Sequence, residues 1–454
     1  MFKHKTSQFE KQLNSILTHQ DKELASIQFT ASKQLDSSIA QSEELLRSLG
    51  YDPANYQSRV STEAPAKEII VPSWNELCKK AEQHVGMDCS LMDLFTAEEL
   101  KSNEVAIQQL NNEYNVLHHL DAIDISIAVI AGIIGAAVDI LLVGVPEKSK
   151  SGLDAGPLSD YIRDYFDKIL PEEEMKKLAN SKVSKVPYDA QDNRNTTIDV
   201  EGLSTYYHRL LQLGHDPLLG FIIGVIDIKY GRMTTIDKGG KFVSQVMKNY
   251  ANRKETDIFA AIAKQFIHFK TDVTTSMGLP VPLMALFNLF QFGSIGEEEQ
   301  TIAEIVQGMY YQGYDFIHFC SMSVPTMIIE VIVRLSYALK HLKEGHCLKD
   351  SIPISTNRTK HPKLKTMLFI AHSAAVAINS GKVYFAKNPV AINYPEWLAF
   401  AQYAYSQLKW AIIEKPSRRR AYIENHINSE LKEIYEKSET TFSSFSENYE
   451  IVFH

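Results

Sequence analysis

A histidine and an aspartate with the chemistry of metal ligands lie four residues apart, in the segment QFIHFKTDVTTSMGLPVP at positions 265–282. Four residues are just over one helical turn, so on a helix the side chains of His268 and Asp272 point the same way. An unpaired ionisable group in such apolar sequence costs free energy. Imidazole and carboxylate are natural ligands of a divalent cation, so the pair predicts a metal site. The segment then breaks at Gly278 and two prolines, as expected where a helix enters a tight turn.

A second group of histidines lies earlier in the chain, in the segment YYHRLLQLGHDPLLG at positions 206–220. His208 and His215 are seven residues apart, which is two turns of a continuous helix. The glycine before His215 and the proline that follows Asp216 interrupt the segment, so we expect His215 at a helix boundary. Asp216 has the position of an N-cap for the next helix, and this capping role competes with a role in chemistry.

The order of these segments resembles the motifs of the prokaryotic inner-membrane metal-dependent hydrolase family. Val138-Asp139-Ile140, the His208-Arg209 … His215 segment and the His268 … Asp272 segment correspond to a DxD-like element, an HRG-x-THS element and an HLLLD-x-LTP-x-G element. The resemblance implies that Asp139, His215, His268 and Asp272 are metal ligands, with His208 close by. A set of uncharacterised bacterial proteins is similar in the His215, His268-Asp272 and Gly-Leu-Pro pattern.

The chain departs from that family at several points. Asp216-Pro217 stands where the family has serine, and His208 and His215 are further apart than in the family. Asp139 lacks the neighbouring second aspartate. The family is membrane-embedded, whereas this chain is larger and more polar. The resemblance covers positions 120–290, which is under half of the chain.

Composition excludes several classes of function. With 454 residues, 44% hydrophobic and 22% charged, the chain is ordinary for a folded protein of two or three domains. A formal net charge of −8 argues against a general nucleic-acid binder. The four cysteines form no CxxC pair and the N-terminus has no apolar signal core, so we expect free thiols in the cytoplasm. The sequence contains no P-loop, dinucleotide-binding GxGxxG, GxSxG elbow or HExxH motif.

Helical periodicity and few alternating patterns predict a mostly α protein, a multi-helix bundle with a long N-terminal helix and a polar insertion. The N-terminal helix, expected over residues 3–48, is amphipathic, and it either forms a coiled coil in an oligomer or lies across the body of the same chain. The predicted regions are an N-terminal helix at 1–50, a linker at 51–72, a helical region with an apolar helix at 73–146, a polar insertion at 147–200 and a helical core domain at 201–454.

The apolar helix is long enough to cross a bilayer, since Ser126 to Val145 matches the roughly 20 residues that a span needs. It contains Asp139, and a charge in the middle of a membrane is rare. The mean hydropathy of the whole chain, −0.18, opposes a polytopic membrane protein. We therefore expect a helix buried by protein, with Asp139 facing a polar cluster.

Two functions remain open at this point. One is a metal-dependent hydrolase acting on a phosphoester or lipid-like substrate, with a divalent metal ion held by His215, His268, Asp272 and Asp139, and with His208 and Asp216 as candidate catalytic residues. The other is a non-enzymatic helical interaction or membrane-active protein. In both, the N-terminal helix favours a homo-oligomer, the location is cytoplasmic, and contact with a membrane surface stays open. Convergence of the candidate ligands distinguishes the two, because an enzyme site requires it.

Overall fold

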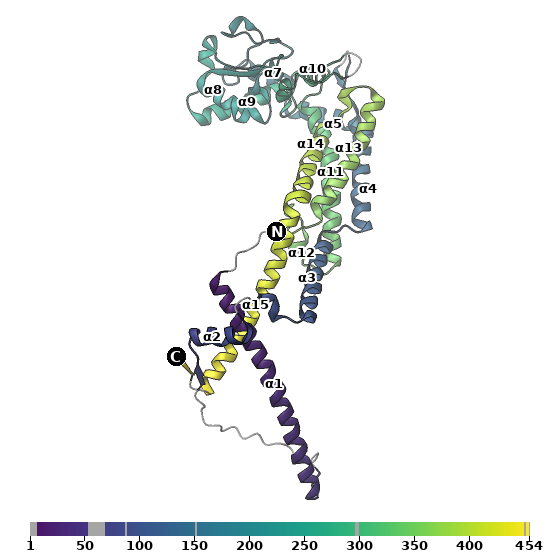
Figure 1. Cartoon of the computed structure of the whole chain (residues 1–454). Helices are drawn as coiled ribbons and strands as arrows, with labels where there is room; N and C mark the ends of the chain where they lie inside the picture. Colours follow the sequence, from purple (N-terminus) through teal and green to yellow (C-terminus); the bar gives the residue numbers. More distant parts are fainter. Residues whose placement is uncertain are drawn as a thin grey trace. The chain divides into compact units, whose positions relative to one another are not determined.

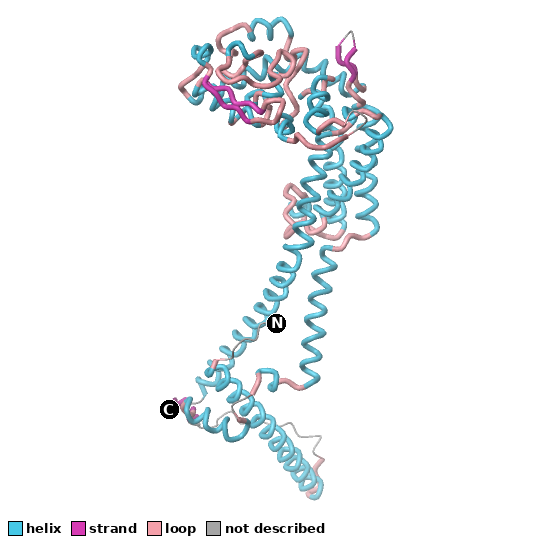
Figure 2. The backbone as a smooth tube through the Cα atoms, turned by 45° about the horizontal axis from the view of Figure 1, so that its top comes forward, coloured by secondary structure: helices cyan, strands magenta, loops and turns pink. Residues whose placement is uncertain are grey.

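The computed structural model describes residues 7–52, 69–86, 89–149, 152–295, 299–448 and 451–453. The chain forms two compact units, Met1–Val116 with Lys415–His454, and Leu117–Glu414. Helices dominate both, which confirms the predicted mostly α class (Figures 1 and 2). Most of the predicted 51–72 linker lies outside the described residues.

The first unit is built from long helices and one small parallel sheet. Its elements are α1 (Gln8–Ser48), β1 (Ile69–Val71), α2 (Trp74–Val85), η2 (Leu91–Leu94), most of α3 (Ala97–His118), α15 (Lys415–Asn448) and β6 (Ile451–Phe453). β1 and β6 pair in parallel, with Ile70 opposite Val452. The pairing joins the C-terminal end to the N-terminal region, so residues 415–454 group there and not with the rest of the predicted 201–454 domain.

The long N-terminal helix is confirmed as α1, which has 41 residues. Ser7 caps it through a reciprocal pair of hydrogen bonds with Glu10. Gly50, in a left-handed conformation with φ of 83°, follows its last turn. Along most of its length the apolar side chains remain exposed, including those of Ile27 and Leu35.

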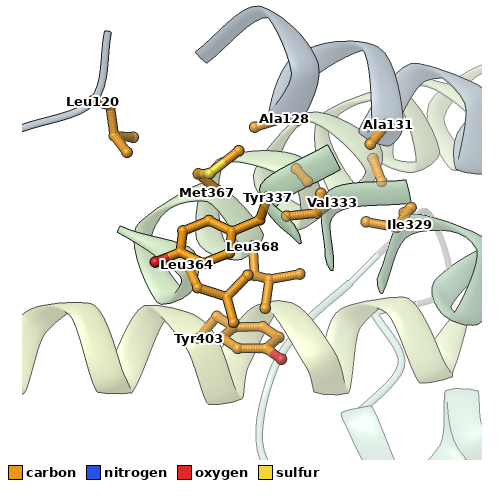
Figure 3. Packing of buried hydrophobic residues seen from close by; sticks show 12 residues of the cluster. Leu120, Ala128, Ala131, Ile329, Val333, Tyr337, Leu364, Met367, Leu368 and Tyr403 are labelled. Carbon is orange, nitrogen blue, oxygen red and sulfur yellow. The ribbon is translucent and has the colours of Figure 1, made fainter. Parts of the chain in front are cut away.

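The second unit contains a bundle of four helices: α4 (Ala122–Val138), continued by the π-helical turn η3 (Asp139–Val143), α11 (Phe316–Lys343), α13 (Leu364–Ala386) and α14 (Tyr394–Lys409), continued by η10 (Trp410–Glu414). α13 packs against α4, α11 and α14 (Figure 1). The core includes Tyr337, Leu368 and Tyr403, whose side chains point into the space between the helices (Figure 3).

The bundle buries only one face of its most apolar helices. In α11, a stripe of four residues at four-residue spacing, Met327, Val331, Leu335 and Leu339, is 57–60% exposed. Ile130 and Ile133 of α4 are about half exposed in the same way. The helix expected to be buried by protein is therefore buried on one side only.

The remaining elements of the second unit lie at one end of the bundle (Figures 1 and 2). They are β2 (Glu147–Ser149), β3 (Gly152–Asp154), α5 (Pro157–Ile169), α6 (Glu172–Ala179), η4 (Asn193–Asn195), α7 (His208–Leu211), η5 (Leu213–His215), η6 (Leu219–Phe221), α8 (Ile223–Tyr230), β4 (Arg232–Ile236), β5 (Phe242–Val246), η7 (Lys248–Arg253), α9 (Ile258–Val273), η8 (Met284–Leu289) and α10 (Ile302–Tyr311). Short α12 (Leu348–Ser351) and η9 (Pro389–Ala391) lie in the connections of the bundle helices. β2 pairs with β3, and β4 with β5, in antiparallel hairpins.

Candidate metal centre

Helix α9 carries the first pair of predicted ligands. Asp257 caps its first turn by accepting a hydrogen bond from the backbone of Ala260. His268 and Asp272, one turn apart near its C-terminal end, are both buried, and His268 Nε2 lies 3.5 Å from Asp272 Oδ2. The helix ends at Val273, and Gly278 follows with φ of 63°, as the break in the sequence predicted.

The second histidine group meets this helix face. His215 ends the short turn η5, in agreement with the predicted helix boundary, and its ring centroid is 5.0 Å from that of His268. The ring of Tyr188 lies edge-on to both imidazoles. Gly214 permits this arrangement, because a Cβ at that position would come within 2.6 Å of the tyrosine ring.

Asp189 brings a fifth side chain with ligand chemistry to the cluster. Its Oδ1 is 3.5 Å from His208 Nε2 and 3.8 Å from His215 Nε2. Two overlapping groups result, Asp189 with His208 and His215, and His215 with His268 and Asp272. Within each group the ligand atoms all lie within 4.8 Å of one another.

The tautomer of His208 leaves a lone pair directed at a carboxylate. Its Nδ1 is 2.9 Å from the carbonyl oxygen of Thr205, so this nitrogen carries the proton and donates it. Burial lowers the pKa of His208, which keeps the ring neutral at neutral pH. Its buried Nε2 has no hydrogen-bond partner among the described residues and faces Asp189. Two electron-rich atoms in this position repel one another unless a cation lies between them.

His215 is oriented in the same way by an amide. Gln212 donates from its Nε2 to the carbonyl oxygen of Ala190, which turns its Oε1 toward His215 Nε2 at 2.9 Å. The imidazole therefore donates from Nε2, and its Nδ1 lone pair faces Asp272 Oδ2 at 3.1 Å. Metal-binding histidines commonly donate their second ring N–H to such an oxygen, which fixes the tautomer.

Arg209 supports the carboxylate of Asp272 from the other side. Its guanidinium donates to Asp272 Oδ1 at 3.1 Å and also bonds Thr275 Oγ1. Burial by itself would raise the pKa of Asp272, but the guanidinium of Arg209 and the adjacent His268 and His215 together outweigh this effect and hold that pKa well below its usual range. The carboxylate is therefore charged at neutral pH, with Oδ2 directed toward His215 and His268.

The donor set suits a divalent cation. It combines imidazole nitrogens with carboxylate oxygens, the ligand types that zinc and similar ions bind. The buried Nε2 of His268, like that of His208, has no hydrogen-bond partner among the residues that the structure describes. An unpaired buried polar atom is costly. Ligation of a cation would satisfy both nitrogens.

Acid is expected to destabilise the metal-free protein through His215. Burial lowers the pKa of His215 from 6.5, its ordinary value in an unfolded chain, to about 4. Between pH 6.5 and pH 4 the unfolded chain takes up a proton that the folded chain does not. The free energy of unfolding should therefore fall by about 3 kcal/mol over this interval and be unaffected by His215 above it. Urea denaturation of chelator-treated protein measures the fall. A His215→Gln variant should show a smaller one, and equal falls would contradict the assignment.

Two predicted site residues have other surroundings. Asp139 lies in the bundle, where its carboxylate accepts hydrogen bonds from Lys382 at 2.9 Å, Asn379 at 3.0 Å and Asn393 at 2.8 Å. These contacts supply the predicted polar cluster and satisfy the carboxylate, and Asp139 belongs to neither group of candidate ligand atoms. Asp216 Oδ1 accepts from the backbone N–H groups of Leu218 and Leu219, which is the competing capping role.

Asp189 is the main residue that sequence reasoning missed. It belongs to the predicted polar insertion at 147–200, where we expected surface-exposed structure. Residues Val186 to Ala190 form a short apolar run, VPYDA, and four of these five residues are buried. An acidic residue inside such an apolar run is a weak signal of a buried site. The high overall polarity of residues 147–200 makes this signal hard to recognise.

Comparison with known proteins found no matching family model, no matching curated protein and no matching solved structure. The resemblance to the inner-membrane hydrolase family therefore rests on the motifs alone. Any functional conclusion depends on the geometry of the site.

Proposed function

We propose that the chain is a metal-dependent hydrolase with a divalent cation bound by His215, His268 and Asp272. The observation that carries this proposal is the pair of buried histidine Nε2 atoms, in His208 and His268, that lack hydrogen-bond partners among the described residues and face carboxylates. An ordinary hydrogen-bonded core would satisfy these atoms. A metal site leaves them available as ligands.

The residues around such a metal site would have different roles. A bound cation would lower the pKa of a water molecule and polarise the scissile group. Asp189, with a side chain 26% exposed, is the cluster residue closest to solvent and is placed to accept a proton from that water. His208 Nε2 faces Asp189 and would share a cation with it, and Arg209 fixes Asp272. We assign the general-base role to Asp189, since the carboxylate of Asp216, a candidate catalytic residue, caps backbone N–H groups instead.

Elemental analysis of purified full-length protein is the direct test. We expect at least one zinc, manganese or similar ion per chain after dialysis. Hydrolysis of bis(p-nitrophenyl) phosphate should be lost on treatment with a chelator and recovered on addition of that ion. A chain that takes up no divalent ion, with no hydrolysis under any metal supplement, would refute the proposal and favour the non-enzymatic alternative.

The exposed apolar faces of the bundle favour a membrane location for the second unit. The helical stretch Ala97–Val143, which contains α4 and η3, and helix α11 are each long and apolar enough to cross a bilayer, and 33% and 39% of their most apolar stretches are buried. α4 has 17 residues and η3 another five, which together are long enough to cross the roughly 30 Å of a hydrocarbon core. The charged residues Asp139, Lys382 and Glu396 face the bundle interior, as in membrane bundles. We infer that the exposed stripes contact lipid.

Cell fractionation provides the corresponding prediction. The protein should sediment with membranes and resist extraction by high salt and alkali, because the contact is apolar. A double substitution in the α11 stripe, Val331→Asn with Leu335→Asn, should shift protein toward the soluble fraction. The matched substitution Leu431→Asn, at an exposed apolar position of α15, should not. Complete extraction of the wild type by salt would contradict membrane insertion.

Exposed apolar positions on α1 support association through the first unit. Leu24, Ile27, Leu35 and Ile39 are each about half exposed or more. A helix with a solvent-exposed apolar stripe gains stability when a second helix covers that stripe. We infer that α1 pairs with a second copy of this chain.

Deletion of residues 1–50 is therefore expected to lower the oligomeric mass. Multi-angle light scattering of full-length and truncated protein, in the same detergent if one is needed, measures the change. The second unit should keep its helical content by circular dichroism, because it forms a separate compact unit. A monomeric mass for both proteins would show that α1 is not used for association.

A further inference from the structure

A surface pocket adjoins the metal centre through Asp189. It has a volume of about 290 Å³, and its walls include Lys185, Asp189, Arg194, Asn195, Tyr250 and Arg253. Asp189 connects it to the buried cluster, since the same carboxylate faces His208 and His215. The pocket is therefore a route by which a ligand can reach the site.

Its walls carry three cationic side chains, of Lys185, Arg194 and Arg253, and two carboxylates, of Asp189 and Asp192. Arg194 is paired with Asp192, whereas Lys185 and Arg253 form no ion pair among the described residues. Arg253 is held in place, with its guanidinium 3.6 Å from the centre of the Tyr250 ring and a hydrogen bond to the carbonyl oxygen of Val186. Lys185 immediately precedes the buried VPYDA run that presents Asp189.

We propose that this basic pocket binds the phosphate group of the substrate. The proposal deepens the hydrolase assignment and rests on it, because a cation held beside Asp189 would cancel the repulsion between that carboxylate and an anion. Guanidinium and ammonium groups are the usual protein partners of phosphate. Asn195 and Tyr250, which share a hydrogen bond of 3.1 Å, add polar contacts.

The size of the pocket limits the ligand. A volume of about 290 Å³ lies at the lower end of small-molecule sites, which commonly begin near 300 Å³. A phosphorylated headgroup or small phosphoester fits, whereas most of a long acyl chain or nucleic acid would lie outside. The phosphate can thus come from a soluble phosphoester or from a lipid headgroup.

Calorimetric titration of the full-length protein with inorganic phosphate tests the assignment. We expect binding in the wild type, weakened about tenfold by Lys185→Ala and by Arg253→Gln, since each removes a charge-assisted contact. Lys182→Ala is the matched control, because Lys182 is an exposed lysine three residues away that does not line the pocket. Lys185 is also exposed, so its replacement leaves the fold intact.

Two further titrations distinguish the sources of phosphate. Tighter binding of dihexanoyl-phosphatidic acid than of glycerol 3-phosphate would assign the pocket to a lipid headgroup, and the reverse order would assign it to a soluble phosphoester. Failure of the wild type to bind any of the three ligands would overturn the proposal. So would equal affinity of the wild type and Lys185→Ala.

Metal content separates this proposal from the one on which it rests. None of the three variants should change the metal content, since none removes a ligand. A metal-free wild type that binds phosphate and loses affinity in Lys185→Ala would refute the metal centre but support the pocket. A metal-loaded wild type without phosphate affinity would support the metal centre and refute the pocket.

Discussion

Replacement of His268 by alanine is expected to remove the bound metal and to lower hydrolytic activity at least 100-fold. His268 offers a buried Nε2 that has no hydrogen-bond partner among the described residues, and it shares its group of ligand atoms with His215 and Asp272. Replacement of even an outer partner of a metal ligand commonly costs about 10–100-fold in metal affinity or activity. Loss of a ligand itself should cost more. The fold should survive, because the Nε2 that the substitution removes makes no hydrogen bond with the described residues.

Elemental analysis, circular dichroism and hydrolysis of a phosphodiester are measured together on this variant. His426→Ala is the matched control, since His426 is an exposed histidine of α15 whose ion-pair contact is with Glu430. It should retain the wild-type metal content. A His268→Ala variant that unfolds, from a wild type that contains no metal, would show that His268 is structural.

Local spacing explains which parts of the site the sequence could predict. His268 and Asp272 lie on one helix, so a separation of four residues fixes their common direction. The break around Gly214 and Pro217 similarly places His215 at a helix boundary. Placing His215 beside α9 needed one further assumption, that buried polar groups are paired with one another. The ring centroids of His215 and His268 are 5.0 Å apart, which agrees with this assumption.

Contacts between distant segments explain what was missed. Asp139 and Asp189 are both acidic residues in apolar sequence, and nothing in their local pattern says which of them meets the histidines. Asp139 instead meets Lys382 and two asparagines, more than 200 residues later in the chain. Such pairing depends on the packing of α4 against α13, which periodicity does not specify.

The same limit applies to the apolar helices. Ser126 to Val145 is apolar around most of its circumference, so the sequence predicted burial on every side. Gly132 and Gly135 allow close approach, since a Cβ on either would clash with α13 or α11. The two glycines therefore determine which face of α4 packs against α11 and α13. The isoleucines on the opposite face remain exposed, because no further helix among the described residues of the second unit covers them.

Asp139→Asn is expected to destabilise the second unit by about 3–5 kcal/mol while leaving its metal content unchanged. The carboxylate pairs with Lys382, and the two side chains are only 4% and 10% exposed. Removing one partner of a buried ion pair leaves the other charge uncompensated, which typically costs this amount. Glu424→Gln, which breaks an exposed pair with Arg420, is the control and should cost less than about 1 kcal/mol.

Thermal unfolding and elemental analysis of the same samples decide the role of Asp139. A double variant, Asp139→Leu with Lys382→Met, should recover part of the lost stability, because it removes both charges and leaves apolar groups of similar size. Loss of metal from a folded Asp139→Asn protein would instead restore Asp139 to the ligand set that the resemblance implied. Retention of metal with lowered stability would show that the proposed ligands of the metal and the polar cluster around Asp139 are separate, and that the cluster around Asp139 stabilises the bundle.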